Sequence, residues 1–201
     1  MLQVRHLYRY PVKGLSAEAL DAVALAAGQG FPLDPRYAIT NGGWTFDGAS
    51  YEPQPKSKFV MLMQHEKLAE LKTRLRADGR LEIIHSDRAP LEFDPEDTAS
   101  RARFSDFIAA LMAGQLPGKP ELVRADGLRF TDVSVVSPAL MNAVSLINLA
   151  SVRALATAIG QEVAPLRFRA NIYFDGGAAW EETDWLDREI TIGGARARVV
   201  M

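Results

Sequence analysis

The stretch 166–185 constrains the fold of this chain most strongly. It opens with two basic residues, Arg167 and Arg169, and continues into an apolar run over 170–174. That run is rich in β-branched and aromatic residues, which favour a pleated, half-buried strand. The Asp-Gly-Gly sequence at 175–177 is a turn signal, because glycine adopts positive φ without steric cost. The stretch therefore predicts a short buried strand with polar residues at its start.

The polar residues at the start of this strand suit an anionic ligand. Arg169 and Asn171 lie where a rigid strand can aim loop residues at a ligand. Arginines in this position bind phosphate or carboxylate bidentately. The alternative is that Arg167 and Arg169 form ion pairs with acidic residues of the following loop, as surface arginines commonly do. The candidate partners are Glu181, Glu182, Asp184 and Asp187.

The rest of the chain shows short strand patterns with few helical ones. Helices are expected where apolar residues recur at spacings of three and four, over 65–76, 99–113 and 149–159. Asn148 and Gly160 suit the N-cap and C-cap of the last helix. The expected fold is mostly β (α+β) with a few peripheral helices. Strands are expected at 2–9, 19–26, the part of 33–40 that follows a turn, 59–63, 81–85, 121–124, 143–147, 172–174, 189–192 and 195–201. The last two are expected to form a hairpin over Gly193-Gly194.

Composition bounds the function classes. The 201 residues allow one large domain or two small ones, and 116–120 is the best candidate linker. The net charge of −2 gives no reason to expect nucleic acid or a membrane surface as partner. No apolar run approaches the roughly 20 residues of a membrane span. No signal peptide is visible at the N-terminus, so a cytoplasmic location is expected.

No residue type in the sequence indicates a metal or catalytic centre. The absence of cysteine excludes disulfides, thiolate metal sites and cysteine nucleophiles in this chain. The histidines, His6, His65 and His85, are isolated from one another and predict structural roles. There is no glycine-rich phosphate loop and no nucleophile elbow. Neither a catalytic residue nor a metal ligand is therefore assigned.

Two further cations stand next to predicted strands. Lys13 follows the first strand, within Tyr10-Pro-Val-Lys-Gly-Leu15, where Pro11 favours extended geometry. Its alternative interpretation is a solvated surface lysine. Arg36 precedes the third strand, and its alternative is an ion pair with Asp34 across the turn.

Four motifs together resemble the MOSC proteins, named after the C-terminal domain of molybdenum cofactor sulfurases. The resemblance covers nearly the whole chain and implies a MOSC N-terminal β-barrel-like region over 1–115 and a MOSC domain over 121–201. It also implies a cleft that holds a molybdenum cofactor (molybdopterin). The motifs are Tyr10-Pro-Val-Lys-Gly-Leu15, Leu33-Asp-Pro-Arg-Tyr-Ala-Ile39, Ser145-Leu-Ile-Asn148, and Arg167-Phe-Arg-Ala-Asn-Ile172 with Trp180, Glu181 and Trp185.

The resemblance assigns cofactor-binding roles residue by residue. Lys13 matches the lysine of the first motif, which contacts the cofactor, and Arg36 matches the arginine of the second. Arg169 and Asn171 match an Arg-x-Asn motif beside the pterin phosphate. Three cations suit a dianionic phosphate through charge-assisted hydrogen bonds.

The chain departs from the family pattern in two places. Family members continue into an Arg-Cys motif whose thiolate ligates molybdenum, whereas this sequence stops at Met201. The position after the first lysine is often serine in the family and is Gly14 here. The expectation is a fragment or shortened product that lacks the metal's protein ligand and is inactive as given.

The function implied by the resemblance is that of a molybdenum-dependent oxidoreductase. When complete, such a protein reduces N-hydroxylated compounds or carries out a related sulfur or oxygen transfer. Its expected partners are a small-molecule substrate and an electron-donor protein. The alternative is a non-catalytic module that binds a cofactor or a phosphate-bearing ligand. Pyridoxal phosphate is not expected, because its lysine in the sulfurases belongs to a separate domain.

Overall fold

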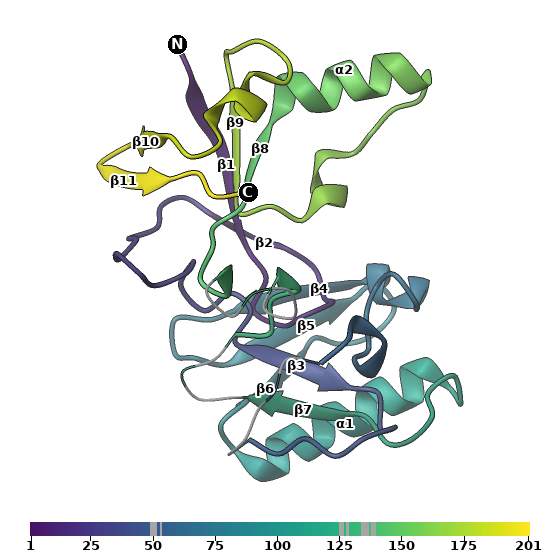
Figure 1. The fold of residues 1–201 in the computed structure, drawn as a ribbon. Coiled ribbons are helices and arrows are strands. Elements are labelled where there is room, and N and C mark those ends of the chain that lie inside the picture. Colours follow the sequence, from purple (N-terminus) through teal and green to yellow (C-terminus); the bar gives the residue numbers. More distant parts are fainter. Residues whose placement is uncertain (49–51, 53, 125–126, 128, 134–136, 138–139) are drawn as a thin grey trace. The chain divides into compact units, whose positions relative to one another are not determined.

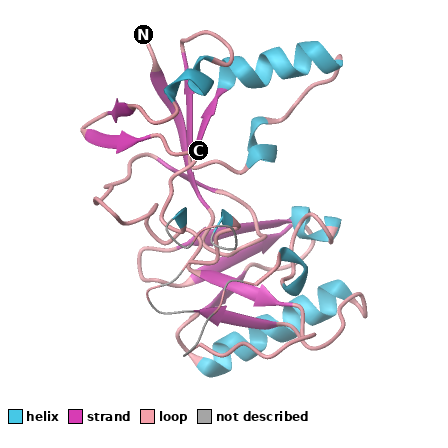
Figure 2. Cartoon of the chain, viewed as in Figure 1, coloured by secondary structure: helices cyan, strands magenta, loops and turns pink. Residues whose placement is uncertain are grey.

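The chain is mainly β, as predicted (Figures 1 and 2). The computed structural model describes residues 1–48, 52, 54–124, 127, 129–133, 137 and 140–201. These residues form two α-helices, several 3-10 turns and four small sheets of two to four strands. None of these sheets closes into a barrel within the described ranges.

Internal contacts divide the chain into two compact units. Unit 1 comprises residues 1–8, 19–32 and 143–201, and unit 2 comprises residues 9–18 and 33–142. Each unit is therefore built from segments that are far apart in the sequence.

Unit 1 is built around strand β9, Ile172–Asp175. It pairs antiparallel with β1, Gln3–Arg9, and parallel with β8, Leu146–Asn148, while β2, Glu18–Leu20, extends the sheet on the far side of β1. Helix α2, Leu149–Ile159, makes the crossover from β8 to β9. The first three residues of β9 are at most 5% exposed, so the predicted buried strand is confirmed.

The helix prediction for 149–159 is also confirmed, with both of its caps. Asn148 Oδ1 accepts a hydrogen bond from Ala150 N at 2.9 Å, which satisfies one of the unpaired N–H groups of the first turn. Gly160 ends the helix at φ 67°, a left-handed conformation that glycine adopts without a Cβ clash.

The predicted C-terminal hairpin of unit 1 is present. Strand β10, Glu189–Ile192, pairs antiparallel with β11, Ala195–Arg198, over a two-residue glycine turn. Most of the side chains on both strands are exposed or half-buried.

Unit 2 holds the largest hydrophobic core. Strand β3, Tyr37–Thr40, pairs with β7, Glu121–Arg124. A second sheet contains β4, Leu71–Leu75, β5, Leu81–His85, and β6, Leu91–Phe93. Helix α1, Thr98–Met112, packs its apolar face against this core, and the Phe93 and Phe104 rings stack with centroids 4.4 Å apart. Two 3-10 turns of this unit are η1, Lys56–Lys58, and η2, Glu66–Glu70.

The helix predicted over 65–76 is wrong, because that stretch forms η2 followed by β4. Leu68, Leu71 and Leu75 fit helical spacing, but Leu71, Thr73 and Leu75 also alternate with exposed residues as a strand requires. Residues 71–75 form a strand because they pair with β5 along their whole length.

Several predicted strands are shorter than expected. The strand expected over 19–26 is reduced to β2 and the one over 143–147 to β8, whereas β3 follows the turn expected within 33–40. Of the stretch 59–63, Phe59 makes a single bridge, to Thr40. Residues 59–61 are nevertheless buried, so their apolar character reflects packing of a loop against the core.

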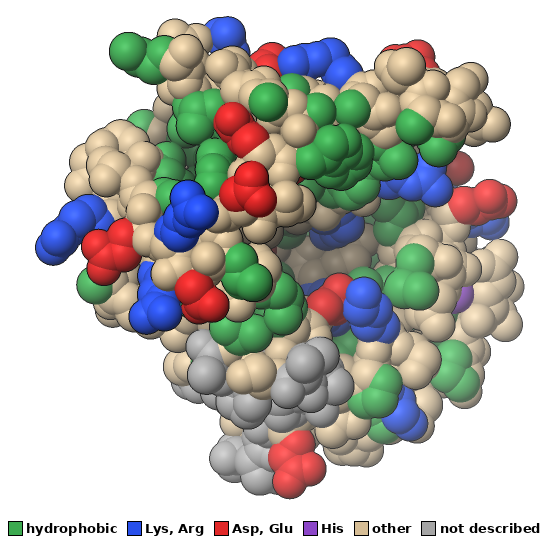
Figure 3. Space-filling view, turned by 45° about the horizontal axis from the view of Figure 1, so that its top comes forward, with side chains coloured by type: hydrophobic (Ala, Val, Ile, Leu, Met, Phe, Trp, Pro, Cys, Tyr) green, Lys and Arg blue, Asp and Glu red, His purple; other side chains and the backbone are tan. Residues whose placement is uncertain are grey.

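The surface carries both signs of charge. Figure 3 shows lysine and arginine interspersed with aspartate and glutamate on one face of the molecule, as expected for a formal net charge of −2. Within the described residues, no helix combines the length and hydrophobicity needed to cross a bilayer.

In unit 2, the backbone of Val60 and Met61 approaches Gly14 so closely that a side chain at this position would clash. The φ of Gly14 is +84°, and a Cβ there would lie 2.6 Å from Val60 O and 2.9 Å from Met61 Cα. Gly14→Ala should therefore add a backbone clash to the cost of positive φ, which is itself about 1–2 kcal/mol. Gly79→Ala is the matched control, since Gly79 has φ +86° and open space around its Cα.

In urea unfolding, we expect Gly14→Ala to lower the free energy of unfolding by at least about 2 kcal/mol more than Gly79→Ala does. Equal losses in the two variants would show that the surrounding backbone moves aside at no cost.

Candidate functional site

In unit 2, the backbone brings the Lys13 and Arg36 motifs together. Lys13 N donates to Tyr37 O at 2.8 Å, and Tyr37 N donates to Pro11 O at 3.0 Å, so the first motif pairs with the start of β3. Tyr10 N also donates to Asp34 Oδ2 at 3.0 Å. Two motifs separated by about twenty residues thus form one local structure.

Lys13 is a buried lysine, which contradicts its interpretation as a solvated surface residue. The residue is 6% exposed, and its Nζ donates to Phe130 O at 2.8 Å and to Asp132 Oδ1 at 2.5 Å. The ammonium also lies 5.5 Å from the centroid of the Phe59 ring. These contacts compensate for the loss of water that burying a charge would otherwise cost.

The sequence did not predict Phe130 O and Asp132 as the partners of Lys13. Asp132 bridges two lysines, because its Oδ2 lies 2.8 Å from Lys56 Nζ. Burial by itself would raise the pKa of Asp132, but hydrogen bonds and charges from Lys13 and Lys56 hold it below its usual value. The lysine–aspartate cluster formed by Lys13, Lys56 and Asp132 therefore carries a net positive charge at neutral pH. No local pattern in the sequence connects these three positions.

Arg36 belongs to a second cluster, around Glu96. Its guanidinium lies 3.6 Å from Glu96 Oε1, so it pairs with this carboxylate and not with Asp34 as the alternative proposed. Glu96 also pairs with Arg124 and accepts from Tyr37 Oη at 2.9 Å. Burial alone would raise the pKa of Glu96, but hydrogen bonds from Arg124 and Tyr37 and the charges of Arg124 and Arg36 lower it. The Arg36 side chain remains 41% exposed.

In unit 1, Arg169 has an unusual backbone conformation. It follows the 3-10 turn η5, Pro165–Phe168, with φ 54° and ψ 39°, and its N–H donates to Leu166 O at 3.1 Å. A left-handed conformation is uncommon for a residue with a Cβ and concentrates at functional sites. Arg169 is half-buried and lies three residues before the start of β9, and the exposed Arg167 lies two residues before Arg169.

Asn171 holds the start of β9 in place. Its Oδ1 accepts from Ser145 N at 3.2 Å and from Ser145 Oγ at 3.0 Å, and its Nδ2 donates to Tyr8 O at 3.2 Å. The residue is 7% exposed. Its amide therefore links β1 to the residue that precedes β8, and it fixes the turn that carries Arg169. Contact with a cofactor stays a prediction for Asn171, as for Lys13, Arg36 and Arg169.

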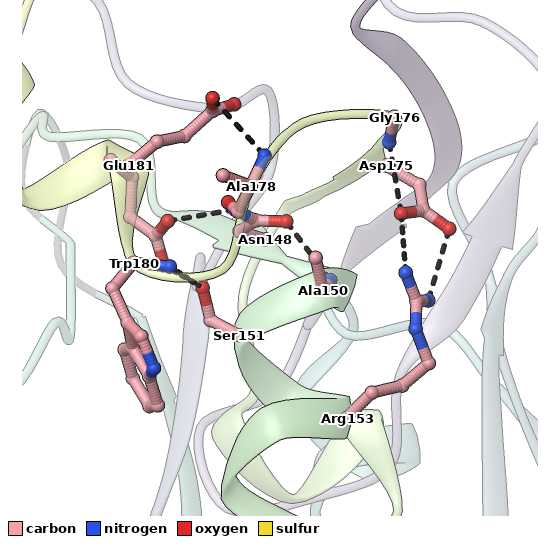
Figure 4. Close-up of polar contacts among 10 residues, drawn as sticks. Asn148, Ala150, Ser151, Arg153, Asp175, Gly176, Ala178, Trp180 and Glu181 are labelled. Carbon is pink, nitrogen blue, oxygen red and sulfur yellow. Dashed lines mark hydrogen bonds and ion pairs between the residues drawn. The ribbon is translucent and has the colours of Figure 1, made fainter.

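The loop after β9 is hydrogen-bonded to the N-terminus of α2 (Figure 4). Glu182 accepts from Ser151 Oγ at 2.6 Å and from Asn148 Nδ2 at 2.8 Å. Glu181 Oε2 accepts from Ala178 N at 3.2 Å (Figure 4). Asp187 lies 3.4 Å from Arg198. Three of the four carboxylates suggested as partners for Arg167 and Arg169 thus have other partners.

An ion pair between Arg153 and Asp175 stabilises the same region. Arg153 on α2 donates to both oxygens of Asp175, at 3.0 and 2.7 Å (Figure 4). Together with Gly176 N, this arginine lowers the pKa of Asp175 to about 2. Asp175 therefore stays ionised at neutral pH and ties the end of β9 to the helix.

The candidate site residues Lys13, Arg36 and Arg169 have cationic side chains, not metal-ligating ones. Nowhere in the described part of the chain do three His, Asp or Glu residues gather in a metal-binding arrangement. His85 is buried and its Nε2 lies 2.9 Å from Glu70, which is a structural arrangement. Within unit 2, Lys13 and Arg36, and within unit 1, Arg169, are each of a type that binds anions by charge-assisted hydrogen bonds.

Tyr37 gives the Glu96 cluster a measurable pH dependence. Burial, with the hydrogen bond to Glu96, raises its pKa to about 12 from an ordinary value of 10. Because the folded pKa is the higher one, the stabilisation is fully present below pH 10 and is lost as the pH rises from 10 to 12. We expect the free energy of unfolding of the wild type to fall by up to about 2 kcal/mol over this range. Urea titrations of the Tyr37→Phe variant should lack this decline, and parallel curves would contradict the assignment.

The lysine–aspartate cluster should be sensitive to loss of one partner. Asp132→Asn leaves the Lys13 ammonium without its carboxylate, so we expect a loss of about 1–3 kcal/mol in the free energy of unfolding. The double variant Lys13→Met/Asp132→Asn should recover part of that loss, because no buried charge remains.

The control for this experiment is Lys56→Met, which removes the exposed lysine of the same cluster and should cost at most about 1 kcal/mol. The folded pKa of Asp132 is lowered, so its contribution is present above pH 4 and is lost below it. An Asp132→Asn variant as stable as the wild type at pH 7 would show that the lysine–aspartate cluster does not stabilise the fold.

Two protein-family models match the chain. Residues 1–116 match the MOSC N-terminal beta barrel domain, and residues 129–201 match the MOSC domain. A comparison with curated proteins found no match. The two matched ranges contain all four motifs, in the expected order. Because the first match alone covers more than half of its residues, the chain belongs to the MOSC family.

Proposed function

We propose that this MOSC chain binds a molybdenum cofactor and holds it by the phosphate of its pterin. The observation that carries the proposal is the match of both MOSC models along one chain. The resemblance assigns the contacts to Lys13, Arg36, Arg169 and Asn171, and the surroundings of each residue can be compared with that role.

In unit 2, Arg36 is the residue best suited to an incoming phosphate. Its guanidinium is partly exposed, and 3.6 Å from Glu96 Oε1 is too long for a hydrogen bond. A phosphate oxygen at hydrogen-bond distance would be the better acceptor. Lys13 is already fixed by Phe130 O and Asp132, so it would bring positive charge without losing side-chain entropy on binding.

In unit 1, the turn before β9 suits the same chemistry. Arg169 is presented in a left-handed conformation that depends on the anchored Asn171, and Arg167 is exposed beside it. A planar guanidinium recognises two phosphate oxygens at once. Asn171 acts here as a positioning residue, because its amide already bonds Ser145 and Tyr8.

The bound cofactor would supply two-electron redox chemistry, which suits the reduction of N-hydroxylated compounds by an electron-donor protein. The chain's own part is to bind and orient the cofactor, since its sequence contains no cysteine to act as a thiolate ligand. The second candidate function is a binding module that holds the cofactor or another phosphate-bearing ligand without turnover.

Cofactor content tests the proposal. The chain should be purified from a host that makes molybdenum cofactor, and its molybdenum should be measured by elemental analysis and its pterin by fluorescence after extraction. We expect pterin in an amount comparable with that of protein. Reduction of benzamidoxime with a chemical electron donor then separates the two candidates: turnover supports the reductase, and pterin without turnover supports the binding module. A chain without pterin would contradict cofactor binding, with or without turnover.

Substitution of the two partly exposed arginines, Arg36 and Arg169, should weaken binding without loss of fold. Arg36→Ala and Arg169→Ala each remove hydrogen bonds to a charged group, worth about 1.5–3 kcal/mol, which corresponds to roughly ten- to hundredfold in affinity for a pterin phosphate. Arg80→Ala is the control, since Arg80 is exposed and lies 4.0 Å from Asp78. Affinities that match those of the wild type in both test variants, or losses as large in the control, would contradict the assignment.

A further inference from the structure

Unit 1 contains a groove that no part of the proposed function uses. Its volume is about 540 Å³, within the range of small-molecule sites. It lies between one face of α2, the strands β1 and β9, and the segment 162–166. All of its lining residues belong to unit 1, and none of the four residues assigned to the cofactor is among them.

One wall of the groove is aromatic. His6 and Tyr8 of β1 and Tyr173 of β9 line it together. The Tyr8 and Tyr173 rings meet edge to face with centroids 5.4 Å apart, and the His6 ring lies 6.0 Å from that of Tyr8. Tyr173 is fixed in place, because its hydroxyl donates to Pro165 O and accepts from Ala170 N. Such a wall attracts flat apolar groups and organic cations.

The opposite wall is apolar and made of small side chains. Val152 and Ala156 lie one turn apart on the face of α2 that lines the groove, and Val163 faces the same space. Ala156 contributes only a methyl group, which leaves volume between the helix and the sheet. A ligand with a phenyl-sized ring would find apolar contacts on both sides.

The charge at the rim is negative. The two charged side chains that line the groove are Arg153 and Glu162. Arg153 is neutralised by its two hydrogen bonds to Asp175 (Figure 4). Glu162 is exposed, and its carboxylate makes no hydrogen bond or ion pair with any residue in the described ranges. The groove therefore combines aromatic rings with one uncompensated carboxylate.

We propose that this groove binds a small organic cation that carries an aromatic ring. The ring lies against Tyr8 and the apolar face of α2, and the cationic group reaches Glu162. The inference goes beyond cofactor binding and stands independently of it, because it uses a different set of residues in unit 1.

A charge series of matched ligands tests the proposal on the full chain. Phenethylamine, 2-phenylethanol and phenylacetate share a phenyl ring and a short tail but are cationic, neutral and anionic at pH 7. Titration followed by amide chemical shifts gives each dissociation constant. We expect the cation to bind with a constant on the order of 1 mM. It should bind about three- to tenfold more tightly than the alcohol, and phenylacetate should bind most weakly.

Two variants and a control locate the site. Glu162→Gln should reduce the affinity for phenethylamine to that for the alcohol, while Ala156→Leu should fill the groove and weaken all three ligands. Glu189→Gln, on the exposed β10 strand outside the groove, should leave every constant unchanged. Far-ultraviolet circular dichroism checks that each variant is folded.

Equal affinities for the three ligands, or an unchanged preference in Glu162→Gln, would overturn the proposal. Shifts confined to residues outside the groove would do so too. Preferential binding of the neutral ligand would instead indicate a purely apolar site and would equally contradict a cation site.

Discussion

A polar side chain can be buried only if it finds partners, and this constraint organises both units. In unit 1 the amide of Asn171 joins Tyr8 and Ser145 and so fixes β9 and the turn that carries Arg169. In unit 2 the ammonium of Lys13 is held by Phe130 O and Asp132. Each polar residue belongs to a motif that resembles the family, so the residues assigned to the cofactor also shape their own surroundings.

The elements with strong local signals could be predicted from the sequence. Helix α2 begins after Asn148 and ends at Gly160 as expected, and β5 and β7 have the expected bounds. The stretch 65–76 could not be predicted, because its leucines fit both helical and strand spacing, and pairing with β5 decides the outcome. Tertiary contact overrides local propensity in such ambiguous runs.

The candidate site was less accessible to sequence reasoning than the fold. The burial of Lys13 depends on Phe130 and Asp132, which lie more than 100 residues further along the chain. The pairing of Arg36 with Glu96 depends likewise on a residue 60 positions away. The groove beside α2 draws on four separate segments, and no motif joins them. Family motifs indicated which cations to consider, whereas their partners follow only from the three-dimensional arrangement.

The central claim is that this MOSC chain recognises an anionic pterin by its phosphate. The most direct measurement is a phosphorus NMR titration of the chain with a pterin phosphate monoester. The account predicts broadening of the phosphorus signal that saturates at one ligand per chain and is reversed by salt, since charge-assisted contacts between exposed groups are screened. An unchanged phosphorus line at every protein concentration would contradict it.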